Sequence, residues 1–284
     1  MTTRGALVLA GGGVAGIAWE TGVLFGIQQV DAGLIDRVVS PATTIIGTSA
    51  GSTVAAQVAT GEALSDLFDR QTSAESAELQ IEFDVATLVA AMGGAMKAAA
   101  SPEDGRRRMG DFAREADTVP PEVRRAVIAA RLLRQEWTDQ PLLIPAIDAA
   151  TGQLRVFDRA SGVGLVDAVT ASCAIPGIWP PVEIDGRLYI DGGTRTSSNA
   201  DLAAGAEQVL IIAPSAEEGP LGSAVTQAER DALAPARVFT IFADDASIAA
   251  MGANPLDPAS RPPAARAGQQ IGHAIAGRLA AFWA

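Results

Sequence analysis

The sequence contains little of what proteins use to crosslink themselves or to carry protons near neutral pH. It has one cysteine, Cys173, and therefore cannot form a disulfide within the chain. It has one histidine, His273, so a Ser-His-Asp triad has a single candidate base. A chain of 284 residues buries enough surface to fold without disulfides or metal ions. We therefore expect no structural metal and a reducing, cytoplasmic environment.

Long apolar runs are also missing. No stretch approaches the roughly 18 uninterrupted apolar residues of a membrane-spanning helix. An apolar run at residues 6–10 follows Arg4, but it stops after five residues in three glycines, whereas a secretory signal needs an apolar core of at least ~7 residues. The sequence thus predicts neither a membrane span nor a secretory signal, and residues 6–10 are typical of a buried first strand.

Positive charge is scarce as well. The chain has 21 lysines and arginines against 33 aspartates and glutamates, and its net charge of −12 argues against binding to nucleic acid. Eight of the 21 basic residues nevertheless lie between Arg106 and Arg134. This cluster is either a solvated helical face or a docking surface for an anionic head group. The second interpretation predicts transient contact with a membrane surface.

Apolar residues make up 48% of the chain and occur in short runs rich in branched side chains. Helical patterns follow most of these runs, and such alternation predicts an α/β fold: a three-layer sandwich with a mostly parallel central sheet flanked by helices. Turn signals at 149–152 and at Asp185-Gly186 predict antiparallel hairpins to strands 154–157 and 187–190. The main predicted strands are 5–10, 43–47, 142–146, 208–213 and 238–242, and the main predicted helices are 17–30, 52–60, 199–205 and 223–233.

One long segment interrupts this alternation. Residues 79–136 show no clear strand pattern and are predicted to be a helical insert within a single domain that spans residues 1–284. Methionine and small residues make an adaptable apolar surface, so the helices between about Val85 and Met109 either cap the substrate site or form another part of the core. Near the end, four prolines within residues 254–263 predict a loop, and a last helix is expected over residues 264–282.

The clearest chemical motif is Gly47-Thr48-Ser49-Ala50-Gly51, which matches G-x-S-x-G. It directly follows a predicted strand and precedes a helical pattern, which is the context in which this motif carries a nucleophile. Small neighbours allow a sharp turn that exposes the serine hydroxyl, and the next helix points its N-terminal N–H groups at the site. Ser49 is therefore the candidate nucleophile, with Gly47 and Gly51 supporting the turn.

A second motif, GGGVAG at residues 11–16, lies between the first strand and the first helix. It matches the dinucleotide fingerprint G-x-G-x-x-G, but that site also needs an acidic residue at the end of the second strand. Asp31 and Asp36 lie where the chain is expected to be a helix end and a loop. The second interpretation is an oxyanion hole formed by N–H groups of Gly11, Gly12 and Gly13.

A third motif, Asp191-Gly192-Gly193, follows a predicted strand and would be an ordinary turn on its own. Its importance depends on the base that Ser49 uses. One candidate arrangement is the triad Ser49–Asp191–His273, which has the chain order of α/β-hydrolases. In the other arrangement Asp191 is itself the base, because a carboxylate within hydrogen-bond reach can accept the serine proton.

The three motifs together resemble the patatin-like phospholipase family. They occur in the family order, and the segment ASCAIP at residues 171–176 is similar to the A-S-x-A-x-P segment that precedes the family's aspartate. The resemblance covers about residues 5–60 and 140–215. It implies a Ser49–Asp191 dyad, an oxyanion hole at Gly11, Gly12 and Gly13, supporting roles for Gly192 and Gly193, no cofactor and no metal, and a lipid or small ester substrate.

The glycine loop departs from the family pattern at one position. The family loop usually carries arginine or lysine before its last glycine, whereas this chain has Ala15 there. A cation at that place would reinforce the oxyanion hole, so backbone N–H groups and helix dipoles are left to do so. The departure leaves a slow or inactive member of the family as one possibility. Separately from Ala15, two other functions stay open at this point: an α/β-hydrolase with a histidine base, and a non-enzymatic dinucleotide-binding protein that uses residues 11–16.

Overall fold

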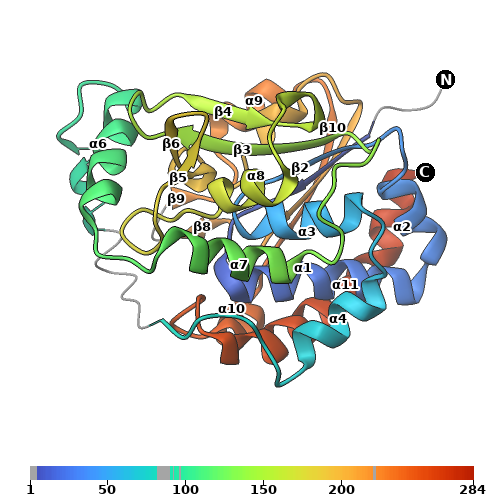
Figure 1. Cartoon of the computed structure of the whole chain (residues 1–284). Helices are drawn as coiled ribbons and strands as arrows, with labels where there is room; N and C mark the ends of the chain where they lie inside the picture. The colour runs from blue at the N-terminus through green and yellow to red at the C-terminus, as the bar shows by residue number, and fades with distance from the viewer. Residues whose placement is uncertain (1–4, 82–89, 92, 96, 220–221) are drawn as a thin grey trace.

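The computed structural model describes residues 5–81, 90–91, 93–95, 97–219 and 222–284. Eight strands form the main sheet, in the order β10-β7-β1-β2-β3-β6-β5, with β4 also paired to β3 (Figure 1). Neighbouring strands from β10 to β3 run parallel, which fits their apolar sequences because parallel sheets are covered on both faces. These strands are β1 (Gly5–Leu9), β2 (Thr44–Gly47), β3 (Leu142–Asp148), β7 (Gln208–Ala213) and β10 (Arg237–Phe242).

The antiparallel strands lie at one end of this sheet. Both β4 (Leu154–Phe157) and β6 (Arg187–Asp191) pair antiparallel to β3, and β5 (Val182–Ile184) pairs antiparallel to β6. The predicted hairpins and the mixed sheet are thus confirmed. A separate small ribbon consists of β8 (Glu218–Gly219) and β9 (Gly222–Ser223).

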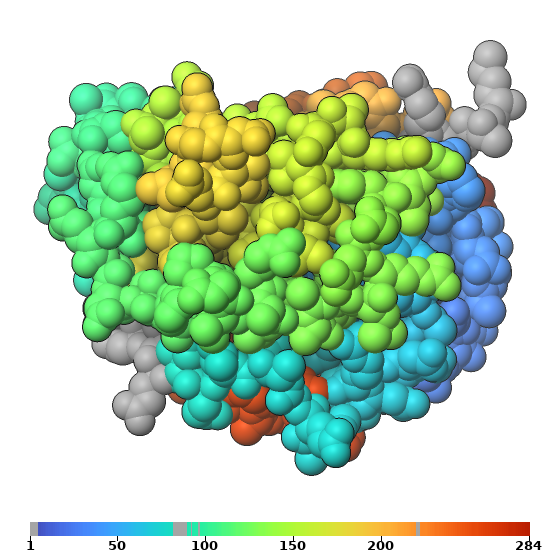
Figure 2. All heavy atoms as spheres, viewed as in Figure 1, coloured from blue at the N-terminus to red at the C-terminus, as the bar shows by residue number. Residues whose placement is uncertain are grey.

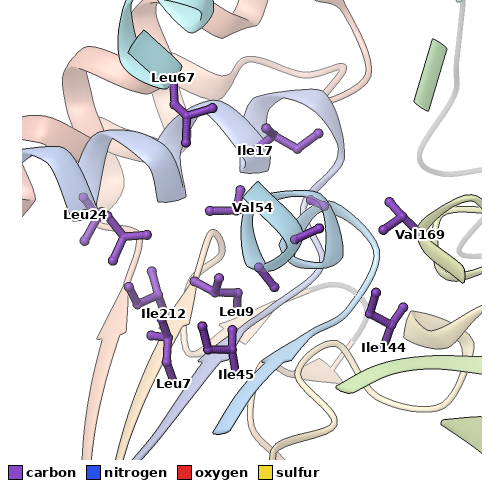
Figure 3. Packing of buried hydrophobic residues seen from close by; sticks show 14 of the residues in the cluster. Leu7, Leu9, Ile17, Leu24, Ile45, Val54, Leu67, Ile144, Val169 and Ile212 are labelled. Carbon is purple, nitrogen blue, oxygen red and sulfur yellow. The ribbon is translucent and has the colours of Figure 1, made fainter. Parts of the chain in front are cut away.

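Alternate residues of each strand face opposite layers of helices. Leu7 and Leu9 of β1 belong to a large core shared with α1 (Gly13–Val30), α3 (Ala50–Ala59) and α11 (Arg261–Trp283) (Figure 3). Ala6 and Val8 point the other way, into a smaller core with η3 (Ala200–Ala203) and α9 (Gln227–Leu233). This confirms the three-layer α/β sandwich. The further helices are α2 (Ala32–Val38), α4 (Leu64–Thr72), α6 (Pro102–Glu115), α7 (Pro121–Arg131), α8 (Leu165–Ser172) and α10 (Asp245–Met251), with single 3-10 turns η1 (Arg159–Ser161), η2 (Gly192–Thr194) and η4 (Pro258–Ser260).

Helices α1 and α11 pack so closely that their backbones touch. A methyl group added at Gly22 or Gly26 of α1 would lie within 2.3 Å of a carbonyl oxygen of α11. The same holds for Gly268 and Gly272 of α11 against carbonyl oxygens of α1. Glycine is therefore required on both sides of this contact. It joins the helix that follows the glycine loop to the last helix of the chain.

Several predicted boundaries were wrong. The first helix begins at Gly13 rather than at residue 17, and Asp31 starts the short helix α2, where its side chain caps the N–H of Leu34. The predicted helix at 199–205 is only the 3-10 turn η3, and α9 begins at Gln227 behind a capping box formed by Thr226 and Glu229. The last helix starts three residues earlier than expected, because its prolines occupy the first turn, where no N–H is needed.

The insert contributes α6 and α7, and the described residues between 79 and 136 contain no strand. The predicted cap at about residues 85–109 falls partly on residues 85–89, 92 and 96, which lie outside the described residues. Helix α7 runs across the face shown in Figure 1 and forms part of the surface in Figure 2. Among the described residues, the helices are all too short or too polar to cross a membrane.

Candidate active site

The turn between β2 and α3 holds Ser49 in a strained conformation. Its φ of 52° and ψ of −117° lie where non-glycine residues are rare, which is the mark of a nucleophile elbow. Added methyl groups at Gly47 and Gly51 would lie 2.4 Å from Gly51 O and 2.1 Å from Leu9 O, so only glycine allows the chain to turn so sharply. The supporting role predicted for these two glycines follows from this close packing.

The hydroxyl of Ser49 donates a hydrogen bond of 2.7 Å to Oδ2 of Asp191. Asp191 ends β6, and its other oxygen, Oδ1, accepts the N–H of Gly193 at 2.6 Å. Both side chains are buried. Burial raises the pKa of Asp191 to about 7, against the opposing effects of the bonds from Ser49 and Gly193 and of the charge on Arg124. The structure therefore brings together the predicted serine and aspartate.

Two neighbours in the segment 171–176 fix the backbone of Ser49. The hydroxyl of Ser172 accepts the Ser49 N–H at 3.0 Å and donates to the carbonyl of Pro145 at 2.7 Å. The thiol of Cys173 donates to the Ser49 carbonyl at 3.1 Å. Sequence reasoning noted this segment only as a family mark. Its physical role is to tie the elbow to β3, the strand beside Asp191.

Asn199 links the elbow to the aspartate loop. Its buried amide donates to Thr48 Oγ1 and to the carbonyl of Gly192, both at 3.2 Å. Its backbone is left-handed, with a φ of 48°, a conformation that asparagine tolerates better than most residues. The sequence indicated Asn199 only as a helix start, because the bonds that define its role join residues far apart in the chain.

The glycine loop after β1 lies beside Ser49. A methyl group at Gly11 would be 3.4 Å from the Ser49 Cβ atom, but the Gly11 N–H already donates to Ser197 O at 2.9 Å. Among the described residues, the N–H groups of Gly12, Gly13 and Ala50 have no hydrogen-bond partner. Gly13 opens α1 and Ala50 opens α3, so two helix N-termini converge on the serine. The backbone N–H groups that are free to bind an oxyanion are therefore those of Gly12, Gly13 and Ala50.

A small cavity of about 10 Å³ lies in front of Ser49, which is room for roughly one oxygen atom. The insert helix α7 reaches it through Arg124 and Arg131, and the C-terminal part of the chain reaches it through Leu256. Ile17 and Arg131 also line a larger, more polar cavity of about 470 Å³. The remaining lining residues of the small cavity are Gly13, Val14, Ala50, Cys173, Ile175 and Trp179.

His273 is not part of this site. It lies exposed on α11, where its Nε2 is 2.8 Å from Oε1 of Gln29 near the C-terminal end of α1. The glycine loop and Ser49 are at the opposite end of α1, which is 18 residues long. The acidic residue expected of a dinucleotide site is also missing, because β2 leads directly into Thr48 and Ser49. The structure supports neither the triad nor the dinucleotide fingerprint.

A layered α/β fold with a strained serine beside a buried aspartate has the layout of a serine hydrolase. The model of the patatin-like phospholipase family matches residues 7–204, more than half of the chain. The chain therefore belongs to the patatin-like phospholipase family, whose members are lipid acyl hydrolases, as the sequence motifs predicted.

Two solved structures are similar to this chain. VipD from Legionella pneumophila matches at 13% identity with a TM-score of 0.38, over 75% of this chain and 50% of its own length. The type III effector protein ExoU matches at 14% identity with a TM-score of 0.42, over 98% of this chain and 53% of its own length. The chain thus spans about half the length of each of these proteins.

Proposed function

We propose that this protein hydrolyses carboxylic esters of lipids, with Ser49 as nucleophile and Asp191 as its base. The proposal rests above all on the 2.7 Å hydrogen bond between the Ser49 hydroxyl and the Asp191 carboxylate, placed at a strained turn. With His273 at the far end of α1, no imidazole from the described part of the chain stands between the two groups. A direct Ser–Asp dyad is the arrangement that this geometry favours.

In the first half of the reaction, Oγ of Ser49 attacks the ester carbonyl carbon while Asp191 takes the hydroxyl proton. The carbonyl oxygen becomes an oxyanion, which the N–H groups of Gly12, Gly13 and Ala50 stabilise together with the dipoles of α1 and α3. The intermediate then expels the alcohol, which leaves with the proton held by Asp191. The product is an acyl-enzyme on Ser49.

In the second half, water attacks the acyl-enzyme and Asp191 accepts a proton from it. The second oxyanion occupies the same donors, and its collapse releases the carboxylic acid and returns the proton to Oγ of Ser49. A carboxylate with a pKa raised to about 7 suits both steps, because it gives and takes protons near neutral pH.

A lipid or phospholipid acyl ester is the proposed substrate class, on the strength of family membership. The cavity lined by Ser49 is small and is bordered by side chains from α7 and from the C-terminal part of the chain, so these side chains are the ones that an acyl chain would meet. Transient contact with a membrane surface and a cytoplasmic location stay predictions.

Replacing the nucleophile tests this function. Ser49→Ala should lower the hydrolysis of p-nitrophenyl esters by several orders of magnitude, because no other group takes over the covalent step. An organophosphonate should label the wild type at Ser49, as read by peptide mass spectrometry. A series of esters of rising acyl length then ranks the substrates.

The matched control is Ser65→Ala, which removes a hydroxyl from the exposed surface of α4 and should leave turnover unchanged. Both variants should give the circular dichroism spectrum of the wild type. Retained turnover in folded Ser49→Ala, or phosphonate attached to another residue, would contradict the proposal.

A further inference from the structure

Arg124 is a buried cation without a hydrogen-bond partner. It lies on α7, only 3% of its surface is exposed, and its Nε and Nη1 atoms have no partner among the described residues. Burial lowers the pKa of its guanidinium to about 9, so the group remains charged at neutral pH. An unpaired buried charge lowers stability, so its presence in the folded protein needs an explanation.

The other buried arginines are all satisfied. Arg106 donates to Gly152 O, Arg131 forms a bidentate pair with Glu78, and Arg261 donates to backbone carbonyls that include that of Glu75. Of the eight basic residues between Arg106 and Arg134, Arg124 alone has no hydrogen bond to a described residue. The lack of hydrogen bonds is therefore specific to Arg124 and is not shared by the other basic residues of the cluster.

The position of Arg124 is beside the nucleophile. Arg124 lines the 10 Å³ cavity together with Ser49, Gly13 and Ala50. The Cζ atom of its guanidinium lies 3.7 Å from the ring centroid of Trp179, which is a cation–π contact. This contact uses no N–H group in a hydrogen bond, so the donors of Arg124 stay available to an anion.

The glycine loop lacks the charge that Arg124 brings. Ala15 occupies the position at which the family loop usually carries a cation, and α7 supplies one from the insert instead. Arg124 and Ser49 line the same cavity, so an ester attacked by Ser49 develops its negative charge close to the guanidinium. A single oxygen with negative charge is what an ester presents once its carbonyl has been attacked.

We propose that Arg124 is a further catalytic residue, whose free guanidinium N–H groups bind the oxyanion formed when Ser49 attacks the ester. This inference rests on the proposed ester hydrolysis. Arg124 forms no covalent bond and gives up no proton. It adds charge-assisted hydrogen bonds to those of Gly12, Gly13 and Ala50 while the tetrahedral intermediate exists.

The test compares Arg124→Met, Arg124→Gln and Arg124→Lys on p-nitrophenyl butyrate, a neutral ester. Loss of one oxyanion donor typically lowers kcat by about 10²- to 10³-fold, and we expect this for Met with little change in KM, whereas Gln should lose less because its amide still donates but carries no charge. Lysine should restore part of kcat, because it keeps the charge without the planar donor pair. Thermal melts should show the Met variant at least as stable as the wild type, since it removes an unpaired buried charge.

Arg125→Met is the matched control, because Arg125 is the next residue of α7 but is exposed and paired with Asp167. It should keep wild-type kcat. The esters should include mono-p-nitrophenyl glutarate, which carries a carboxylate. A loss confined to KM for this anionic ester would assign Arg124 to substrate recognition and overturn the proposal.

Wild-type kcat in a folded Met or Gln variant would overturn it as well. If Met does not fold, the Gln variant decides the outcome: it keeps a donor but loses the charge, so its kcat should still fall below that of the wild type. A wild type that shows no hydrolysis dependent on Ser49 would instead contradict the proposed function itself, and with it the role of Arg124.

Discussion

Asp191 is held where its neutral form is favoured, although the proposed reaction needs its ionised form. Burial raises its pKa from 3.8 to about 7, while the hydrogen bonds from Ser49 and Gly193 act in the opposite direction. A base of this strength is close to half-ionised at neutral pH, which suits proton transfer in both directions. At neutral pH the raised pKa lowers the stability of the folded protein by about 1.4 kcal/mol for each unit of pKa shift.

The pH dependence of hydrolysis should therefore follow Asp191. We expect kcat/KM to rise with pH through an apparent pKa near 7, because the aspartate must lose its proton before it can accept one from Ser49. Asp191→Asn should be nearly as damaging as Ser49→Ala, since an amide cannot take the proton. A pH-rate profile of the wild type and single-pH assays of the variant measure both effects.

His273 provides the control for this prediction, because an imidazole base would give an acid limb in the same pH range. His273→Ala should retain both the rate and the limb near pH 7, since its side chain lies exposed beside Gln29. Loss of activity in folded His273→Ala, or loss of the limb, would mean that the dyad is wrong.

At the scale of the element, α1 carries a buried carboxyl group with little to offset its burial. Glu20 is completely buried, and its carboxyl oxygens have no hydrogen bond of good geometry to a described residue, only a weaker interaction with the backbone of Ala10. Burial raises its pKa well above 4.5, so the folded protein holds it protonated over a pH range in which the unfolded chain ionises. The stability associated with the protonated form is complete below pH 4.5 and is lost as the pH rises toward the folded-state pKa.

Glu20→Gln should consequently raise stability at pH 7–8, because glutamine has no charge to give up on folding. The gain should be largest at pH 8 and should shrink toward zero near pH 4, where glutamate is mostly protonated in both states. Urea unfolding at pH 4, 6 and 8 measures it, with the exposed Glu122→Gln on α7 as control. A variant that is less stable than the wild type at pH 8 would show that Glu20 has a stabilising partner.

The elements themselves were predictable to different degrees. The buried strands were found within a residue or two, because continuous apolar runs bounded by turn residues are a strong local signal. The start of α1 was missed because three glycines suggest a loop. The helix begins at Gly13 all the same, and the N–H of Ala15 in its first turn donates to the carbonyl of Pro255, more than two hundred residues away. No local pattern contains that contact.

At the scale of the molecule, some residues of the site could be predicted from the sequence and others could not. Ser49 and Asp191 were predicted because each lies in a short motif directly after a strand. Arg124 and Asn199 were not, because their positions depend on how the insert and the loop after β6 fold back onto the elbow. Arg124 stands among seven other basic residues between Arg106 and Arg134, and only packing distinguishes it from them. The single domain over residues 1–284 stays a prediction.

The contact between Ala15 and Pro255 has a consequence for the newly made protein. Translation adds about 5–20 residues each second and releases the N-terminal part first. A chain grown as far as Pro214 already holds Ser49 and Asp191, but not the carbonyl of Pro255 or the side chain of Leu256 that lines the cavity. The helix that packs on α1 comes later still. We therefore expect Ser49 to be inactive while the polypeptide is still growing on the ribosome. Hydrolase activity should appear only after α11 has been synthesised and has packed on α1.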